Sequence, residues 1–328
     1  MQNIINGLPI AAVILLLAVG FAFLVKGADF FVEGSSSIAK KLKVPPIIIG
    51  LTIVAMGTSL PETAVSVTAS LVQNNELAVS NVVGSNIFNL MFVIGVCSIL
   101  TPIMVQKATV VRDIPLSLGC ALFLLVLGVS GLGDKAGMTL GHADGVIFLI
   151  VFAGYIFTMV RSAMKARAAG QKVEIEGVEE CDNMKELSYG KSILFLIVGA
   201  AAIAFGGDLT VDTASRIAIE LGMSQTLVGL TIVSIGTSLP ELVTSVVAAR
   251  KNEVDMAVGN AIGSNIFNIL MVLGIASAIS PLQLIGENVI DIIVLVVFSV
   301  VVWIFGATKK KISRTEGIAM ICMYLCYS

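Results

Sequence analysis

A thirteen-residue segment that occurs twice constrains the fold of this chain more than any other feature. GLTIVAMGTSLPE at residues 50–62 recurs as GLTIVSIGTSLPE at residues 229–241, and eleven of the thirteen positions are identical. The same offset of 179 residues aligns GSNIFN at 84–89 with GSNIFN at 263–268. Self-similarity of this extent indicates that the chain contains one structural unit twice.

The composition indicates that lipid surrounds these two units. Hydrophobic residues make up 57% of the 328 residues and charged residues only 13%, which leaves too little polar surface for a water-soluble protein. Several runs approach or reach the roughly 20 apolar residues that cross a bilayer as a helix, and they lack the alternation of barrel strands. These runs are residues 10–25, 116–129, 146–160, 193–204 and 290–305. The sequence therefore predicts an all-α membrane protein.

Ten apolar spans divide equally between the two units. The first unit contains spans at 8–39, 44–72, 77–100, 114–132 and 144–161, and the second contains spans at 190–218, 223–249, 256–279, 288–306 and 312–328. An odd number of crossings makes the second unit enter the membrane upside down, which is the inverted-repeat design of secondary transporters. We therefore predict two five-helix repeats, residues 1–161 and 190–328, joined by a linker at 162–189.

Basic residues in the loops predict the orientation. One set of alternate loops holds 17 of the 20 Lys and Arg, the opposite set holds only Lys135 and Arg216, and Lys26 lies inside the first span. Because Lys and Arg concentrate on the cytoplasmic side, we expect both termini outside and the linker inside, in a plasma or inner membrane. Residues 1–9 carry no Lys or Arg, so we expect no cleaved signal peptide. A net charge of -2 indicates neither nucleic acid nor an obligate protein partner.

Each copy of the long motif ends in a glutamate, Glu62 or Glu241, placed deep in an apolar span. A charged side chain there costs about 2.5–3.5 kcal/mol on insertion scales. The preceding proline removes a backbone donor and glycine loosens the same turn, so carbonyl oxygens are freed beside the carboxylate. A single motif of this kind is often only a helix kink. Two copies, each with a buried glutamate, favour a functional site.

Oxygen-bearing side chains accompany both glutamates. Within about one helical turn or at i, i+4 spacing the sequence offers Thr58, Ser59 and Glu62, then Thr237, Ser238 and Glu241, with Ser85 and Asn89 from the third span and Ser264 and Asn268 from the eighth. Such oxygens suit hard cations, and Ca²⁺ takes about six to eight of them. Two glutamates give a charge of -2 when ionised, which one divalent cation neutralises, and several Na⁺ ions can use the same oxygens.

Other chemistry is poorly supported. The five cysteines, Cys97, Cys120, Cys181, Cys322 and Cys326, are scattered without ligand spacing. The single histidine, His142, excludes an HExxH site and argues against a Ser-His-Asp triad. Asp29 and Asp208 are paired by the repeat but lie late in their spans, which argues against an aspartate pair and leaves snorkelling, helix pairing and ion access open. We expect neither an enzyme nor a cofactor.

The GTSLPE and GSNIFN motifs resemble the alpha repeats of the sodium/calcium exchanger family, within the calcium/cation antiporter superfamily, over essentially the whole chain. The resemblance implies ten helices around midplane cation sites, with Glu62 and Glu241 binding calcium and the neighbouring threonines and serines lining calcium and sodium sites. It also implies backbone carbonyl ligands from Ala55 and Ser234. Asn268 stands where potassium-dependent relatives have Asp, which argues against potassium transport.

The resemblance implies antiport of Ca²⁺ against Na⁺ by alternating access. Because both ions would use the same glutamates, they would bind in turn, and the empty closed site would hold two uncompensated carboxylates in a low dielectric. A proton-coupled or other divalent cation exchanger remains the alternative, and a channel would lack coupling to a counter-gradient.

Overall fold

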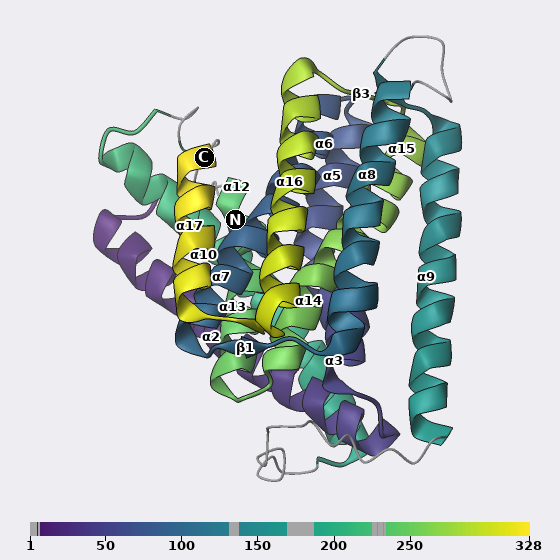
Figure 1. The fold of residues 1–328 in the computed structure, drawn as a ribbon. Helices are drawn as coiled ribbons and strands as arrows, with labels where there is room; N and C mark the ends of the chain where they lie inside the picture. Colours follow the sequence, from purple (N-terminus) through teal and green to yellow (C-terminus); the bar gives the residue numbers. More distant parts are fainter. Residues whose placement is uncertain are drawn as a thin grey trace.

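The computed structural model describes residues 5, 7–130, 138–168, 187–224, 228, 232 and 234–328. Within this part of the chain the protein is helical apart from two antiparallel pairs of two-residue strands. Strand β1 (Ile103–Met104) pairs with β4 (Lys311–Ile312), and β2 (Thr139–Leu140) pairs with β3 (Leu282–Gln283). These pairs connect loops of the two halves at the ends of the helices (Figure 1).

The helices of the first half follow the repeated segments. They are α2 (Ile10–Leu42); α3 (Pro46–Ile49), the π-helical η1 (Gly50–Val54), α4 (Ala55–Thr58) and α5 (Leu60–Leu71); α6 (Asn75–Phe88), the π-helical η2 (Asn89–Val93) and α7 (Ile94–Leu100); the π-helical η3 (Thr109–Asp113) and α8 (Ile114–Ser130); and α9 (His142–Ala168). In the second half they are α10 (Tyr189–Glu220); α12 (Ser234–Gly236) and α13 (Leu239–Arg250); α14 (Val254–Phe267), the π-helical η6 (Asn268–Leu273) and α15 (Gly274–Ile279); α16 (Gly286–Lys309); and α17 (Arg314–Tyr327).

Seven helices in the described residues are long and apolar enough to cross a membrane, and they coincide with seven of the ten expected spans. The expected span at 44–72 is a bent pair, Pro46–Thr58 and Leu60–Leu71, with an angle of 49°. Part of the span at 223–249 lies outside the described residues. The last span is the 14-residue helix α17, which is shorter than the roughly 20 residues of a straight crossing.

Both copies of the long motif interrupt their helix at the same place. Ser59 and Ser238 leave the helical conformation, with φ/ψ of -84°/11° and -92°/3°. Two residues later Pro61 and Pro240 occupy the first turn of α5 and α13, where a missing N–H costs little. The sequence therefore restarts a helix beside each motif serine.

Two of the π-helical segments also obey the repeat. Segments η2 and η6 begin at Asn89 and Asn268, the last residues of the two GSNIFN motifs. A π-helical turn leaves backbone groups without their usual α-helical partners and occurs often at functional sites. The short motif therefore ends each time in an irregular turn at the centre of the protein.

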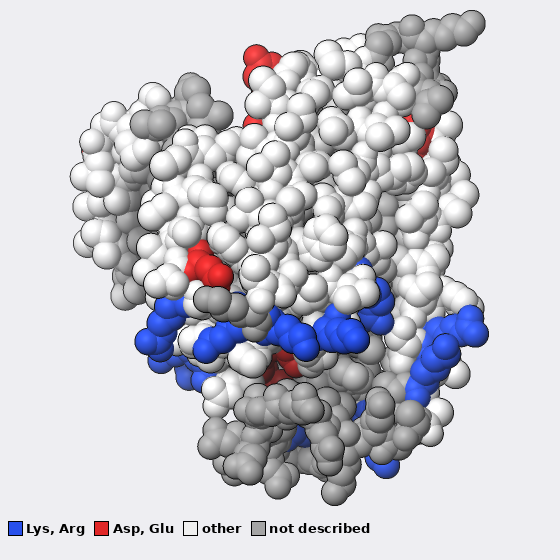
Figure 2. Space-filling view, viewed as in Figure 1, with Lys and Arg blue, Asp and Glu red and all other residues white. Residues whose placement is uncertain are grey.

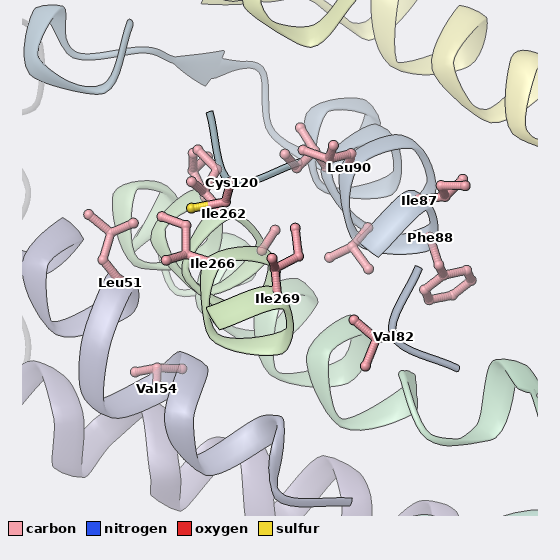
Figure 3. Packing of buried hydrophobic residues seen from close by; sticks show 14 of the residues in the cluster. Leu51, Val54, Val82, Ile87, Phe88, Leu90, Cys120, Ile262, Ile266 and Ile269 are labelled. Carbon is pink, nitrogen blue, oxygen red and sulfur yellow. The ribbon is translucent and has the colours of Figure 1, made fainter. Parts of the chain in front are cut away.

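The core forms around α6 and α14, the two helices that lead into GSNIFN. Figure 3 shows side chains of η1, α6 and α14 converging, among them Leu51, Val82 and Ile266. The apolar windows of the spans Leu77–Leu100 and Val254–Ile279 are each 78% buried. This packing holds the two short motifs next to the first of the long motifs.

The long helices α2 and α10 lie against each other on the outside of this core (Figure 1). A Cβ atom added at Gly27 would lie 2.9 Å from the nitrogen of Ile203, and one added at Gly199 would lie 2.7 Å from the nitrogen of Phe31. Glycines allow such close approach of backbones in membrane helices.

Basic side chains gather on one part of the molecule. Figure 2 shows Lys and Arg in a belt around its lower part, while the wide surface above the belt carries few charges. The C-terminal end of α17 points away from the belt (Figure 1). The one-sided charge predicted from the loops is therefore visible in the folded protein.

Candidate cation-binding site

The two motif glutamates lie in the interior, in the first turns of α5 and α13. Both are fully buried. Their position at helix N-termini places each carboxylate at the positive end of a helix dipole, which stabilises a negative charge. The fold thus places two acidic groups where water does not reach them.

Each carboxylate is held by one hydroxyl of its own repeat and one of the opposite repeat. Glu62 Oε1 accepts hydrogen bonds from Ser85 and Ser238, each at 3.3 Å. Glu241 Oε1 accepts hydrogen bonds from Ser264 at 3.4 Å and Ser59 at 3.0 Å. The pattern is two-fold symmetric, because Ser59 and Ser238 are equivalent in the repeat, as are Ser85 and Ser264.

The second oxygen of each carboxylate has no protein partner. Glu62 Oε2 and Glu241 Oε2 are both buried without a hydrogen bond. A buried polar atom without a partner costs free energy, and for a charged group the cost is larger. Two such oxygens in one cluster form a set of ligands that a cation would complete.

The motif threonines face the other repeat. Thr58 Oγ1 lies 3.0 Å from Asn260 Oδ1, and Thr237 Oγ1 lies 3.2 Å from Asn81 Oδ1. Thr58 also contacts the carbonyl oxygens of Val54 and Ala55, at 3.2 Å and 3.3 Å. Both threonines therefore lie in the same interior layer as the serines.

The asparagines that end the short motifs differ from each other. Asn268 Nδ2 donates to Ser85 Oγ at 3.4 Å and to Asn86 Oδ1 at 3.1 Å. Asn89 is fully buried, and neither its amide oxygen nor its amide nitrogen has a partner. The centre of the site is thus asymmetric, although both residues come from the same motif.

The two residues expected to contribute carbonyl oxygens lie just before the breaks. The carbonyl of Ala55 accepts hydrogen bonds from the Ser59 backbone nitrogen at 3.0 Å and from the Thr58 hydroxyl. Ser234 begins α12, and its side chain lies outside the described residues. One turn earlier, the carbonyl of Leu51 accepts a hydrogen bond from Tyr155 at 2.8 Å.

Several polar residues of this layer were not predicted from the sequence. Asn81 and Asn260 contact the threonines, and Ser66 and Ser245 support these asparagines. At the crossing of α6 and α14, Asn86 Nδ2 donates to the carbonyl of Asn265 at 3.2 Å and Asn265 Nδ2 to that of Asn86 at 3.0 Å. All three pairs are related by the offset of 179 residues, which is the signal that would have found them.

Residues that the sequence left open lie elsewhere. Asp29 contacts Lys251 at 3.2 Å and Lys26 at 3.7 Å, which supports helix pairing, whereas Asp208 is exposed. His142 is exposed, with Nδ1 at 2.9 Å from the carbonyl of Ala278. Cys97 and Cys120 are buried, Cys322 and Cys326 are exposed, and Cys181 lies outside the described residues.

The family model described as sodium/calcium exchanger protein matches residues 12–161 and 191–328 of this chain. The chain belongs to the sodium/calcium exchanger family. The resemblance inferred from GTSLPE and GSNIFN is therefore confirmed, and with it the assignment to a family of multi-pass membrane cation antiporters rather than of enzymes.

Relatives of this exchanger chain cover most of its length. It is 33% identical over 337 residues to the sodium/calcium exchanger MaX1 of Methanosarcina acetivorans, covering 95% of this chain and 96% of the relative. It is 41% identical over 263 residues to the putative antiporter CaxA of Alkalimonas amylolytica, covering 80% and 79%. A solved structure of the sodium-calcium exchanger NCX_Mj matches with a TM-score of 0.80 and 33% identity, covering 97% of this chain and 98% of that chain.

Proposed function

We propose that this protein exchanges Ca²⁺ for Na⁺ across the membrane, and that both ions bind in turn between Glu62 and Glu241. The observation that carries the proposal is the pair of buried carboxylates, each held by hydroxyls of both repeats through one oxygen and without a partner at the other. Two ionised carboxylates carry a charge of -2, which one Ca²⁺ ion neutralises. Na⁺ ions, which also prefer oxygen ligands, replace it.

The proposed ligand set consists of oxygen atoms from both repeats. It comprises the carboxylates of Glu62 and Glu241, the hydroxyls of Thr58, Ser59, Ser85, Thr237, Ser238 and Ser264, the amide oxygens of Asn89 and Asn268, and the backbone carbonyls of Ala55 and Ser234. Oxygen ligands of this kind suit hard cations. The relative NCX_Mj has been studied after soaking with Na⁺, Ca²⁺ or Sr²⁺, which supports the choice of ions. The exchange requires no cofactor and no obligate protein partner.

The carboxylates also supply a reason for strict exchange. An empty and closed site would keep two charges buried without compensation, at a cost of several kcal/mol per charge. A loaded site avoids this cost, so only loaded forms reorient. The exposed pair α2 and α10 would slide against the core during reorientation, as the close glycine contacts between these helices permit.

The proposed architecture is ten transmembrane helices in two inverted repeats. Residues 1–161 and 190–328 form the repeats, and residues 162–189 form a cytoplasmic linker. The symmetric hydrogen bonds around the glutamates support the inversion. The one-sided basic belt supports a cytoplasmic lower side, with both termini outside, in a plasma or inner membrane (Figure 2).

The test is Ca²⁺ uptake by proteoliposomes into which the purified protein has been reconstituted. We expect an outward-directed Na⁺ gradient to drive uptake, and the double substitution Glu62→Gln and Glu241→Gln to reduce it by about 100-fold or more, since removing one partner of a buried charge pair costs about 3–5 kcal/mol. Glu287→Gln is the matched control, because Glu287 is exposed at the start of α16.

Imposing the gradients separately distinguishes the competing functions. Uptake that a pH gradient drives in the absence of Na⁺ would indicate a proton-coupled exchanger, and Ca²⁺ flux without any counter-gradient would indicate a channel. Full activity of the double variant would contradict the proposed site.

A further inference from the structure

Two asparagines outside the proposed ligand set occupy equivalent positions in the repeats. Asn81 lies on α6 and Asn260 on α14. Asn260 Nδ2 donates to Ser245 Oγ at 2.9 Å within its own repeat, and Asn260 Oδ1 lies 3.0 Å from the hydroxyl of Thr58 in the other repeat.

The same contacts recur around Asn81. Its Nδ2 donates to Ser66 Oγ at 3.0 Å, and its Oδ1 lies 3.2 Å from the hydroxyl of Thr237. Each asparagine thus joins a serine of its own repeat to a motif threonine of the opposite repeat. The repetition of the whole arrangement argues against an incidental contact.

The serine fixes the direction of each amide. An asparagine side chain has a donor end and an acceptor end, and a threonine hydroxyl has one proton and two lone pairs. Because the amide nitrogen is bound to the serine, the amide oxygen is the end that faces the threonine. The threonine hydroxyl then donates its proton to this oxygen and keeps its lone pairs for another partner.

Without the asparagine, the proton of Thr58 would move to a backbone carbonyl. The carbonyl oxygens of Val54 and Ala55 are the other acceptors within reach, at 3.2 Å and 3.3 Å. The carbonyl of Ala55 belongs to the proposed ligand set, so a proton donated to it would compete with the ion. The amide of Asn260 therefore protects a carbonyl ligand and orients a hydroxyl ligand at once.

We propose that Asn81 and Asn260 are positioning residues that orient the hydroxyls of Thr237 and Thr58 across the repeat boundary, so that the threonine oxygens face the transported ion. The inference rests on the proposed function, because it assigns these threonines to the ion site. Each half of the protein thereby sets the geometry of ligands in the other half.

Double-mutant cycles test this pairing. The matched cycles combine Thr58→Val with Asn260→Leu and Thr237→Val with Asn81→Leu, and the mismatched control combines Thr58→Val with Asn81→Leu. The measurements are the half-saturating concentrations of Ca²⁺ and Na⁺, the maximal exchange rate in proteoliposomes and the thermal unfolding midpoint of the ion-free protein in detergent.

We expect each single substitution to raise the half-saturating ion concentration about five- to tenfold, the range for loss of one hydrogen-bonded contact. A matched double variant should be no worse than its Thr→Val single variant, since the asparagine acts through that threonine. The mismatched double variant should show the product of the two single effects. A merely structural role would lower the unfolding midpoint and the maximal rate without this pattern.

Ser66→Ala and Ser245→Ala keep the test decisive if a leucine variant fails to fold. They release the amide but leave the asparagine and the threonine in place, and we expect a two- to threefold increase in the half-saturating concentration, on the order of a weak hydrogen bond. Absence of Na⁺-driven Ca²⁺ uptake by the wild-type protein would overturn the proposed function and this inference with it. Normal wild-type exchange with multiplicative effects in the matched cycles, or unchanged affinity in both serine variants, would overturn this inference alone.

Discussion

The core helices and the outer helices hold their neighbours by different means. In the spans that carry GSNIFN, 78% of the apolar window is buried, and polar side chains bind across the repeat boundary. In α2 and α10 only 22% and 33% of the window is buried, and the two helices meet through glycines. The chemistry is therefore built into the part with fixed contacts, whereas the outer pair has a smooth surface suited to movement.

The ties between the outer pair and its surroundings are few and lie near the basic belt. Lys251, in the turn after α13, contacts the carboxylate of Asp29 on α2 and donates to its backbone carbonyl at 3.1 Å. Ser37 on α2 accepts a hydrogen bond from Ser192 on α10 at 2.9 Å. The repeat-equivalent Asp208 is exposed. The outer helices are thus tied to the core unequally in the two halves.

The glycine contacts should give the largest effect when broken. In Gly199→Ala the new Cβ would lie 2.7 Å from the nitrogen of Phe31, so α2 and α10 must separate. We expect a loss of about 1–3 kcal/mol in stability, the usual cost of overpacking, and a clear loss of Ca²⁺ uptake. Gly154→Ala on α9 is the matched control, because nothing lies within 4 Å of its added Cβ. Equal unfolding midpoints of the two variants would refute the close contact.

A smaller effect is expected from the ion pair between α2 and the core. The side chains of Lys251 and Asp29 are 27% and 32% exposed, so solvent screens the pair and we expect Lys251→Met to cost about 1 kcal/mol or less. The combined exchange Asp29→Lys and Lys251→Asp should recover part of the loss in a thermal unfolding assay. Asp208→Asn should leave stability unchanged, and an equal loss there would show that the asymmetry has no energetic meaning.

The smallest effect concerns pH. Glu253 lies in the turn before α14, outside the spans, and burial raises its pKa above the ordinary value of 4.5. Between the unfolded and the folded pKa the folded state holds the proton more tightly, so this group makes stability fall as pH rises through that window. Glu253→Gln should flatten this decline in unfolding midpoints measured from pH 4 upward, whereas Glu287→Gln should keep the wild-type slope.

The sequence predicted the parts of the site that the duplicated motifs carry. The glutamates, motif serines and motif threonines lie in one layer because each motif places them within one turn, and the two copies are brought together by the fold. The support from Asn81 and Asn260 was not predicted, because these contacts join residues 156 and 202 positions apart. Local pattern does not determine such distances, although the gapless repeat contained the hint.

The difference between Asn89 and Asn268 had no signal in the sequence, because both end the same motif. It arises from packing, since Asn268 reaches Ser85 and Asn86 while Asn89 finds no partner. The irregular turns that begin at these residues follow from packing as well. The fold class was predictable from apolar runs alone, whereas the number of crossings depended on short or bent segments.

The hydroxyl that each glutamate receives from the opposite half sets a time order during synthesis. When the ribosome has released only the first half, Glu62 lacks the partner that Ser238 later provides. The nascent first half cannot use ion binding to assist its insertion, so apolar packing must hold it in the bilayer until α13 arrives. Two halves expressed from separate messages should therefore gain the capacity to bind cations together or not at all.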